Sequence, residues 1–194
     1  MPAWETLRQL LRSPAVGDTP AGGPMVREPW GRDFPSDYRR FVDEYGAGTI
    51  QAYLDVLAPD GMRTETANAE YQWAETAKAP ELAGANPVLI AWGTTADADI
   101  LCWDGSGADP DRWPVLVYCR TWSIWRRYDL TATEFLVRVL RGGFPENPLG
   151  GAGLFGAGTA TFLTDAEQRG RLRAGLDPWT GEPDPYAGMY TYPE

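Results

Sequence analysis

Apolar residues recur along this chain with a helical spacing in some segments and a strand spacing in others. The clearest helical stripe lies within residues 33–48, where four apolar residues fall at i, i+3, i+4 and i+7: Tyr38, Phe41, Val42 and Tyr45. Pro35 suits the first turn of this helix, Asp33 or Ser36 can cap it, and Gly46 can adopt the left-handed conformation that ends it. Similar spacing predicts helices at 2–12, 64–78 and 131–141.

The strand spacing dominates the middle of the chain. Residues 49–57 alternate between apolar and polar side chains, which predicts a half-buried strand. Further apolar runs of strand length follow at 88–92, 100–103, 115–120 and 122–128, separated by short turns without helices, as in an antiparallel meander. With helices before and after them, these runs predict an α+β fold: one antiparallel sheet of about five strands with helices packed mainly on one side.

Composition divides the chain near residue 142. Residues 1–142 are expected to form the domain, with a Pro- and Gly-rich loop or linker at 13–31. Residues 143–194 are Gly- and Pro-rich and are expected to form a C-terminal extension. Thr164 and Glu167 have the spacing of a capping box, so this extension should contain one short helix that ends near Gly175.

The helical segment also carries a resemblance to a known family. Phe-Pro-Ser-Asp-Tyr-Arg-Arg-Phe-Val-Asp-Glu-Tyr-Gly-Ala-Gly, at residues 34–48, resembles the opening signature of the SUKH superfamily (the Smi/Knr-like domain), in which a Pro–acid–Tyr helix ends in a Gly-containing turn before the first strand. Residues 91–99 add to the resemblance, which covers roughly residues 30–142. It implies a non-enzymatic binding domain, and many bacterial members are immunity proteins that neutralise a cognate toxin.

Charge narrows the classes of partner. The net charge is −10 and the sequence pI is about 4.5, so the protein should repel the phosphates of nucleic acids and suit a basic protein partner, such as a toxin domain. No apolar run reaches the length of about 18 residues that a membrane span needs, and no signal segment opens the sequence. We therefore expect a cytoplasmic protein without membrane contact, in which Cys102 and Cys119 are buried free thiols.

The sequence lacks the residues that several kinds of catalytic and metal-binding site require. Histidine is absent, which removes Ser-His-Asp and Cys-His arrangements, and two cysteines are too few for the usual zinc sites. Lys78 is the only lysine and no P-loop surrounds it. The glycines at 150–153 and 156–158 resemble a dinucleotide loop but lack a βαβ unit, so we interpret them as flexible loop. We predict no enzymatic activity, no cofactor and no bound metal.

Acidic and aromatic residues concentrate between residues 92 and 125. Five acids lie there without the spacing of an EF-hand: Asp97, Asp99, Asp104, Asp109 and Asp111. They can be turn formers that bind their own backbone, or they can form an acidic contact surface. Alternation along 122–128 predicts that Trp122 faces the core with Ile124 and that Trp125 faces outward.

The predicted partner-binding residues are therefore these five acids and Trp125. The favoured function is an immunity protein that neutralises a toxin through an acidic surface. A regulatory or scaffold module without a toxin partner remains an alternative, and a hydrolase that uses a pair of carboxylates is a third possibility. Neither the partner's identity nor the oligomeric state follows from the sequence.

Overall fold

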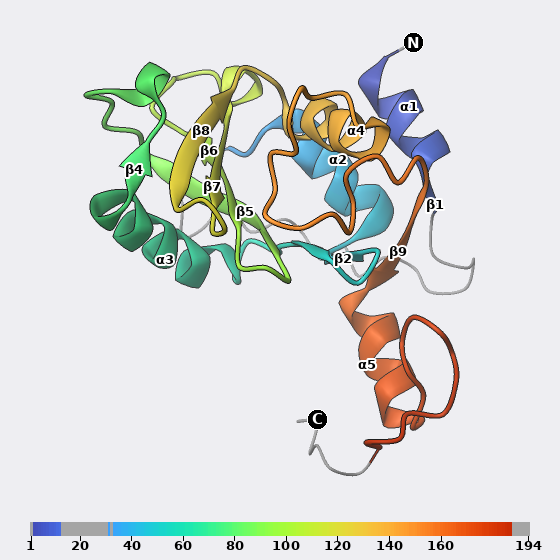
Figure 1. Cartoon of the computed structure of the whole chain (residues 1–194). Helices are drawn as coiled ribbons and strands as arrows, with labels where there is room; N and C mark the ends of the chain where they lie inside the picture. Colours follow the sequence, from blue (N-terminus) through green and yellow to red (C-terminus); the bar gives the residue numbers. More distant parts are fainter. Residues whose placement is uncertain (1, 13–30, 32, 188–194) are drawn as a thin grey trace.

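The computed structural model describes residues 2–12, 31 and 33–187 of the chain (Figure 1). Its α-helices are α1 (Ala3–Leu10), α2 (Ser36–Tyr45), α3 (Met62–Glu75), α4 (Ala132–Arg141) and α5 (Asp165–Arg173). Its strands are β1 (Leu11–Arg12), β2 (Gly48–Ile50), β3 (Leu54–Val56), β4 (Ala77–Lys78), β5 (Leu89–Thr95), β6 (Ile100–Asp104), β7 (Val115–Cys119), β8 (Ile124–Tyr128) and β9 (Ala160–Thr164). Two 3₁₀ turns, η1 (Pro80–Leu82) and η2 (Pro110–Arg112), complete the elements. The loop expected at 13–31 lies outside the described residues except for Gly31.

The sheet confirms the α+β class and differs from the expected sheet in size and direction. It has nine strands in the order β1-β9-β2-β3-β5-β6-β7-β8-β4. The central strands are antiparallel, as expected, but β1 pairs with β9 and β4 pairs with β8 in parallel. The expectation of about five antiparallel strands is therefore wrong. The two parallel edges use two-residue strands, which are too short to show any periodicity.

The single strand expected at 49–57 is instead a tight hairpin of β2 and β3. Gln51 and Ala52 both have positive φ, 53° and 54°, and the Tyr53 N–H donates to the Ile50 carbonyl oxygen at 3.0 Å. The turn inserts three residues between Ile50 and Leu54, which are paired across the hairpin. The apolar alternation continues through these residues, so alternation could not reveal the turn.

Helices cover both faces of the sheet, unequally. The larger core lies on the face of α1, α2 and α4, where Trp92 and Trp103 stack with their ring centroids 5.8 Å apart. The smaller core on the other face includes Ala69 of α3, Tyr118 and Trp125. The expectation that helices pack mainly on one side agrees with this arrangement, in which α3 alone among the larger helices covers the second face.

The signature helix α2 is built into the larger core. Its four apolar residues are buried, and Gly46 ends the helix with φ 82° before β2 begins. The N-cap residue is Pro35, which supplies no side-chain cap. Asp111 from a distant turn accepts a hydrogen bond from the Ser36 backbone N–H at 2.5 Å. Asp37 in the first turn accepts from the Tyr38 N–H at 2.8 Å. The start of α2 is thus held both by a tertiary contact and by its own sequence.

The C-terminal segment contributes both to the sheet and to a projecting arm. β9, which the sequence suggested was part of an extension, lies between β1 and β2. The short helix expected after it is α5, and its capping box of Thr164 and Glu167 is confirmed. No residue of α5 is buried, and the helix extends away from the body of the molecule (Figure 1).

Candidate functional site

The five predicted acids do not form one surface. Asp97 and Asp99 lie in the turn that connects β5 to β6, whereas Asp104, Asp109 and Asp111 lie at the other end of β6. We call residues 96–99 the upper acidic turn and residues 104–114 the lower acidic turn. The two turns are separated by the length of β6, so a single partner residue cannot contact both.

Asp99 is wholly buried and joins three segments of the chain. Its carboxylate accepts hydrogen bonds from the Thr95 hydroxyl (2.9 Å), the Arg120 backbone N–H (2.9 Å) and the Gly150 backbone N–H (2.8 Å). A buried carboxylate needs such donors to offset the loss of its hydration. Asp99 is therefore a structural residue, and its assignment to a partner-binding surface is wrong.

Two carboxylates of the lower acidic turn, Asp104 and Asp109, bind backbone groups near them, whereas Asp111 accepts from the distant Ser36 N–H. Asp104 accepts from the N–H and the hydroxyl of Ser106 and from the Val88 N–H, and Asp109 accepts from the Asp111 N–H. This confirms that Asp104 and Asp109 act as turn formers. Asp109 and Asp111 are exposed, as is Asp97 in the upper turn, and their contact with a partner stays a prediction.

The predicted orientation of the two tryptophans is reversed. Trp125 is 0% exposed, with its ring centroid 5.3 Å from that of Trp73 and 5.4 Å from that of Tyr118, whereas Trp122 is 67% exposed. Trp122 is exposed because β8 begins only at Ile124, so Trp122 lies in the turn after β7, where Ser123 has φ 48°. Trp125 is buried because α3 covers the second face of the sheet, where Trp125 joins the smaller core with Ala69 and packs against Trp73.

Three hairpin turns lie side by side at one end of the sheet. The β2–β3 turn adjoins the β5–β6 turn because Leu54 pairs with Thr95, and the β7–β8 turn adjoins it because Ile100 pairs with Tyr118. We call this set the turn rim: residues 51–53, 96–99 and 120–123. Every non-glycine residue with positive φ in the described chain lies in it: Gln51, Ala52, Ala98 and Ser123.

Positive φ in residues with a side chain is costly, and such strain persists only where surrounding contacts hold the backbone. In this protein a fourth segment supplies those contacts. The Gly151 N–H donates to the Tyr53 hydroxyl at 3.0 Å, and the Gly150 N–H donates to Asp99. A glycine is required at position 150, since a Cβ there would lie 2.6 Å from the Thr121 hydroxyl oxygen and 2.9 Å from Asp99 Oδ1.

These contacts also test the resemblance of 150–153 to a phosphate-binding loop. The backbone N–H groups of Gly150 and Gly151 are already engaged by Asp99 and Tyr53, and the carboxylate of Asp97 lies directly against Gly151. A phosphate would meet negative charge at this position. The loop is fitted to the turn rim rather than shaped around an anion.

Tyr53 connects the β2–β3 turn to the upper acidic turn. The pKa of its hydroxyl is raised from 10.0 to about 12, chiefly by burial, with contributions from the hydrogen bond to Asp97 and the charge of Asp99. Tyr53 therefore stays neutral, donating a hydrogen bond to the Asp97 carboxylate and accepting one from the Gly151 N–H.

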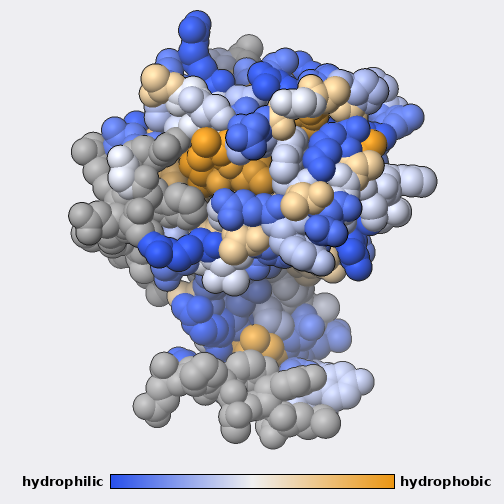
Figure 2. Space-filling model, turned by 90° about the vertical axis from the view of Figure 1, so that its left-hand side faces the viewer, coloured by the Kyte–Doolittle hydropathy of each residue, from blue (hydrophilic) through white to orange (hydrophobic). Residues whose placement is uncertain are grey.

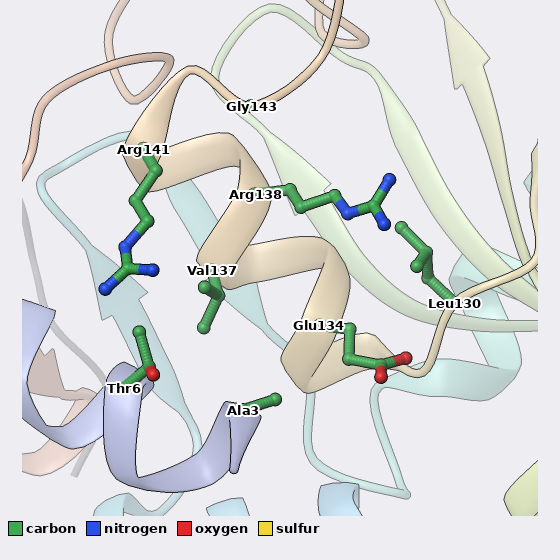
Figure 3. A pocket seen from close by; sticks show the side chains of 8 residues that line it. All are labelled: Ala3, Thr6, Leu130, Glu134, Val137, Arg138, Arg141 and Gly143. Atoms are coloured by element: carbon green, nitrogen blue, oxygen red, sulfur yellow. The ribbon is translucent and has the colours of Figure 1, made fainter. Parts of the chain in front are cut away.

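Two open cavities lie elsewhere, beside α4. The larger, of about 460 Å³, is lined by Ala3, Thr6, Leu130, Glu134, Val137, Arg138, Arg141 and Gly143. Figure 3 shows that Arg138 and Arg141 point in different directions, with Val137 between them. The second, of about 240 Å³, shares Leu130 and Glu134 with it. Because the two guanidinium groups do not converge, this hollow does not have the form of an anion clamp.

The rest of the described surface and the two thiols show no further site. The face in Figure 2 is largely hydrophilic, with one recessed apolar patch. Cys102 and Cys119 are buried, as expected, and burial raises the pKa of both thiols. Among the described residues, no three His, Cys, Asp or Glu side chains are grouped to hold a metal ion, and none of their helices is long and apolar enough to cross a membrane.

No family model, no curated protein and no solved structure matches this chain. Membership of the SUKH superfamily therefore stays a prediction that rests on residues 34–48 and 91–99.

Proposed function

We propose that this protein is a protein-binding domain whose contact surface is the turn rim, and that it neutralises a basic toxin. The observation that carries the proposal is Trp122, a large aromatic side chain that is 67% exposed in a turn whose neighbours are joined to one another by hydrogen bonds. Tryptophan is among the residues that most often supply the binding energy of protein interfaces.

The construction of the rim supports this use. Association is weakened by the entropy lost when loops become ordered, and loops that are held before binding lose less. Here the Arg120 N–H is bound by Asp99, and the Thr121 hydroxyl donates to the Gly150 carbonyl oxygen at 3.4 Å, so both residues before Trp122 are held. Small exposed side chains at Ala96 and Ala98 leave the neighbouring surface open to a partner.

Charge supports a basic partner. The chain has a net charge of −10, and the exposed Asp97 lies on the rim itself. A negative surface accelerates encounter with a positive protein. The toxin is a proposal taken from the SUKH resemblance, and the helix, glycine turn and strand at 36–50 have the order that this resemblance requires.

The alternatives use other features. A regulatory or scaffold module could use the same rim for a partner that is not a toxin. A carboxylate-pair hydrolase has less support, because all three donors around Asp99 are structural contacts and Asp97 is engaged by Tyr53.

The experiment combines binding with rescue of growth. Toxin domains encoded beside the gene for this chain are co-expressed with it and titrated with it by calorimetry, and their association rate is measured by stopped-flow fluorescence at low and high salt. We expect one of them to bind, to lose toxicity and to associate more slowly as salt rises. Binding without any effect on toxicity would favour the regulatory alternative, and failure of all of them to bind would contradict the immunity function.

The matched control locates the surface. Trp122→Ala should weaken binding by about 2 kcal/mol or more while leaving the free energy of unfolding nearly unchanged. Tyr186→Ala removes an aromatic side chain of similar exposure, 58%, from the C-terminal arm that extends away from the body of the molecule, and should leave binding unchanged (Figure 1). Equal effects of the two substitutions on binding would show that the turn rim is not the contact surface.

A further inference from the structure

The chain contains two Asp-Gly pairs, Asp60-Gly61 and Asp104-Gly105, in very different surroundings. In such a pair the backbone nitrogen of glycine can attack the side-chain carbonyl carbon of aspartate, because glycine has no Cβ to hinder the approach. The rate in a folded protein then depends on whether that nitrogen and that carboxyl group are near each other and free to move. The structure allows the two pairs to be compared directly.

At Asp60-Gly61 the reacting groups are adjacent and exposed. The Gly61 N–H donates to Oδ1 of Asp60 itself at 3.0 Å, so the nitrogen already faces the carboxyl group. Both residues are exposed, in the turn between β3 and α3. Water can therefore reach the site, and the turn can adjust as the ring closes.

At Asp104-Gly105 both reacting groups are held by other partners. The Gly105 N–H donates to the Val88 carbonyl oxygen at 2.7 Å. The Asp104 carboxylate accepts from the Ser106 hydroxyl at 2.5 Å and from the Ser106 N–H at 3.1 Å. Attack would require these hydrogen bonds to break at the end of β6, where Asp104 pairs with Leu89.

We propose that Asp60 is a site of spontaneous isoaspartate formation in the folded protein, and that Asp104 is protected from the same reaction. The Gly61 nitrogen forms a bond to Cγ of Asp60 and loses its proton, while the carboxyl hydroxyl leaves with a proton as water. The product is a five-membered succinimide. One water then adds across either of its carbonyl–nitrogen bonds, which restores aspartate or gives isoaspartate, in which the backbone runs through the side chain. No oxidant or reductant takes part.

The change would act on the start of α3. Isoaspartate adds one methylene group to the backbone immediately before this helix, where the Met62 N–H donates to the Ala58 carbonyl oxygen at 3.1 Å and Met62 is buried. The preceding residue Leu57 accepts a hydrogen bond from the Tyr38 hydroxyl at 2.6 Å. Modification at Asp60 therefore loosens the attachment of α3 and moves the carboxylate of residue 60 from its side chain to its former main-chain carboxyl group, with the charge unchanged.

The test is incubation of the purified full chain at mildly acidic and neutral pH, followed by peptide mapping with mass spectrometry and by enzymatic methylation of isoaspartyl groups. We expect a peptide with Asp60 that first appears lighter by one water and then returns to the original mass with a new retention time. The reaction should be faster at the lower pH, because only the protonated carboxyl group loses water. The Asp104 peptide should stay unchanged in the folded protein.

Two controls separate structure from local sequence. In denaturant, both Asp-Gly pairs should react at similar rates; if Asp104 stays unreactive there too, its protection is not structural and the contrast fails. Gly61→Ala should suppress the reaction at Asp60 while the protein still folds, because Gly61 has an ordinary negative φ of −70° and a Cβ there would lie 3.5 Å from the Ala58 carbonyl oxygen. Equal product at the two sites in the folded protein, or unchanged product in Gly61→Ala, would overturn the proposal.

Discussion

The upper and lower acidic turns lie at the two ends of the same strand, β6, and both are rich in aspartate. Their carboxylates nevertheless accept hydrogen bonds from different parts of the chain. In the upper turn, Asp99 binds its own turn, the start of the β7–β8 turn and the loop at residue 150. In the lower turn, Asp104 and Asp109 bind backbone groups of their own turn or of the adjoining strand end. The buried Asp99 alone joins three segments of the chain. The carboxylates of the lower turn divide their contacts, and only Asp111 reaches a distant segment, where it accepts from the Ser36 N–H at the start of α2.

The difference teaches that aspartate in a turn has two uses that look alike in sequence. An exposed carboxylate that caps nearby N–H groups needs only local residues. A buried carboxylate needs donors from all sides, and these come from wherever the fold brings them. Burial of Asp99, rather than its residue type, makes the upper turn the centre of the rim. The predictions that follow test this contrast.

The largest expected effect is at the buried carboxylate. Asp99→Ala leaves the N–H groups of Arg120 and Gly150 without their acceptor and should lower the free energy of unfolding by about 3 kcal/mol or more. Asp104→Ala, at the other end of β6, should cost about 1 kcal/mol. Denaturant titration of both variants measures the difference, and similar losses would show that the two turns are equivalent.

A second test adds a methyl group beside each turn. Gly150→Ala forces a Cβ to within 2.9 Å of Asp99 Oδ1, which is buried and cannot move aside, and should cost about 1–3 kcal/mol. Gly107→Ala in the lower turn places its Cβ 3.5 Å from the nearest Trp113 atom, an ordinary contact. It should change stability by less than about 0.5 kcal/mol. A tolerated alanine at position 150 would argue against a closely fitted rim.

A third test uses pH. The pKa of Tyr53 is about 12 in the folded protein and near 10.0 when unfolded, so between these values the unfolded chain releases a proton that the folded protein keeps. Stability should therefore fall as pH rises from 10 to 12. Tyr53→Phe should reduce this fall without abolishing it, since the pKa of Tyr45 is also raised to about 12. The free energy of unfolding is measured from pH 10 to 12, and tyrosinate absorbance follows the ionisation in parallel. If its dependence on pH is the same in Tyr53→Phe as in the unchanged protein, the prediction is wrong.

The smallest expected effects differ in sign. Ala98 in the upper turn has φ 62°, so Ala98→Gly should stabilise the protein by about 0.5–1 kcal/mol through release of strain. Ala108 in the lower turn lacks a positive φ, and Ala108→Gly should destabilise by about 0.5–1 kcal/mol because glycine gives the unfolded chain more freedom. Thermal unfolding of the two variants measures both changes. Changes of the same sign would show that the positive φ of Ala98 does not strain the folded protein.

Helices and central strands could be predicted because their signal is local. The apolar stripe of α2, the capping boxes of α4 and α5 and most of the meander follow from residues that are close in sequence. The parallel edges could not be predicted, since a two-residue strand has no period. β9 was hidden by the glycines around it, because only its position between β1 and β2 makes it a strand.

The candidate surface was located only in part. Its acidic turn was identified, but Trp122 was misplaced because alternation was carried through a turn without glycine or proline. Thr121, Trp122 and Ser123 gave no local indication that the strand begins at Ile124, two residues after its predicted start. Trp125 was misplaced because helices were expected mainly on one side of the sheet, whereas α3 covers the other face. The role of Asp99 depends on Gly150, which is far away in sequence, so no pattern near Asp99 could reveal it.

The position of β9 has a consequence for how this protein is made. Leu11 pairs with Ala160 and Ile50 pairs with Phe162, so the ribosome must translate most of the chain before strands formed early receive their partner. Until then β1 has no strand beside it within the described sheet, and one edge of β2 is open. β1 and the outer edge of β2 are thus paired only at a late stage of synthesis, when β9 completes the sheet.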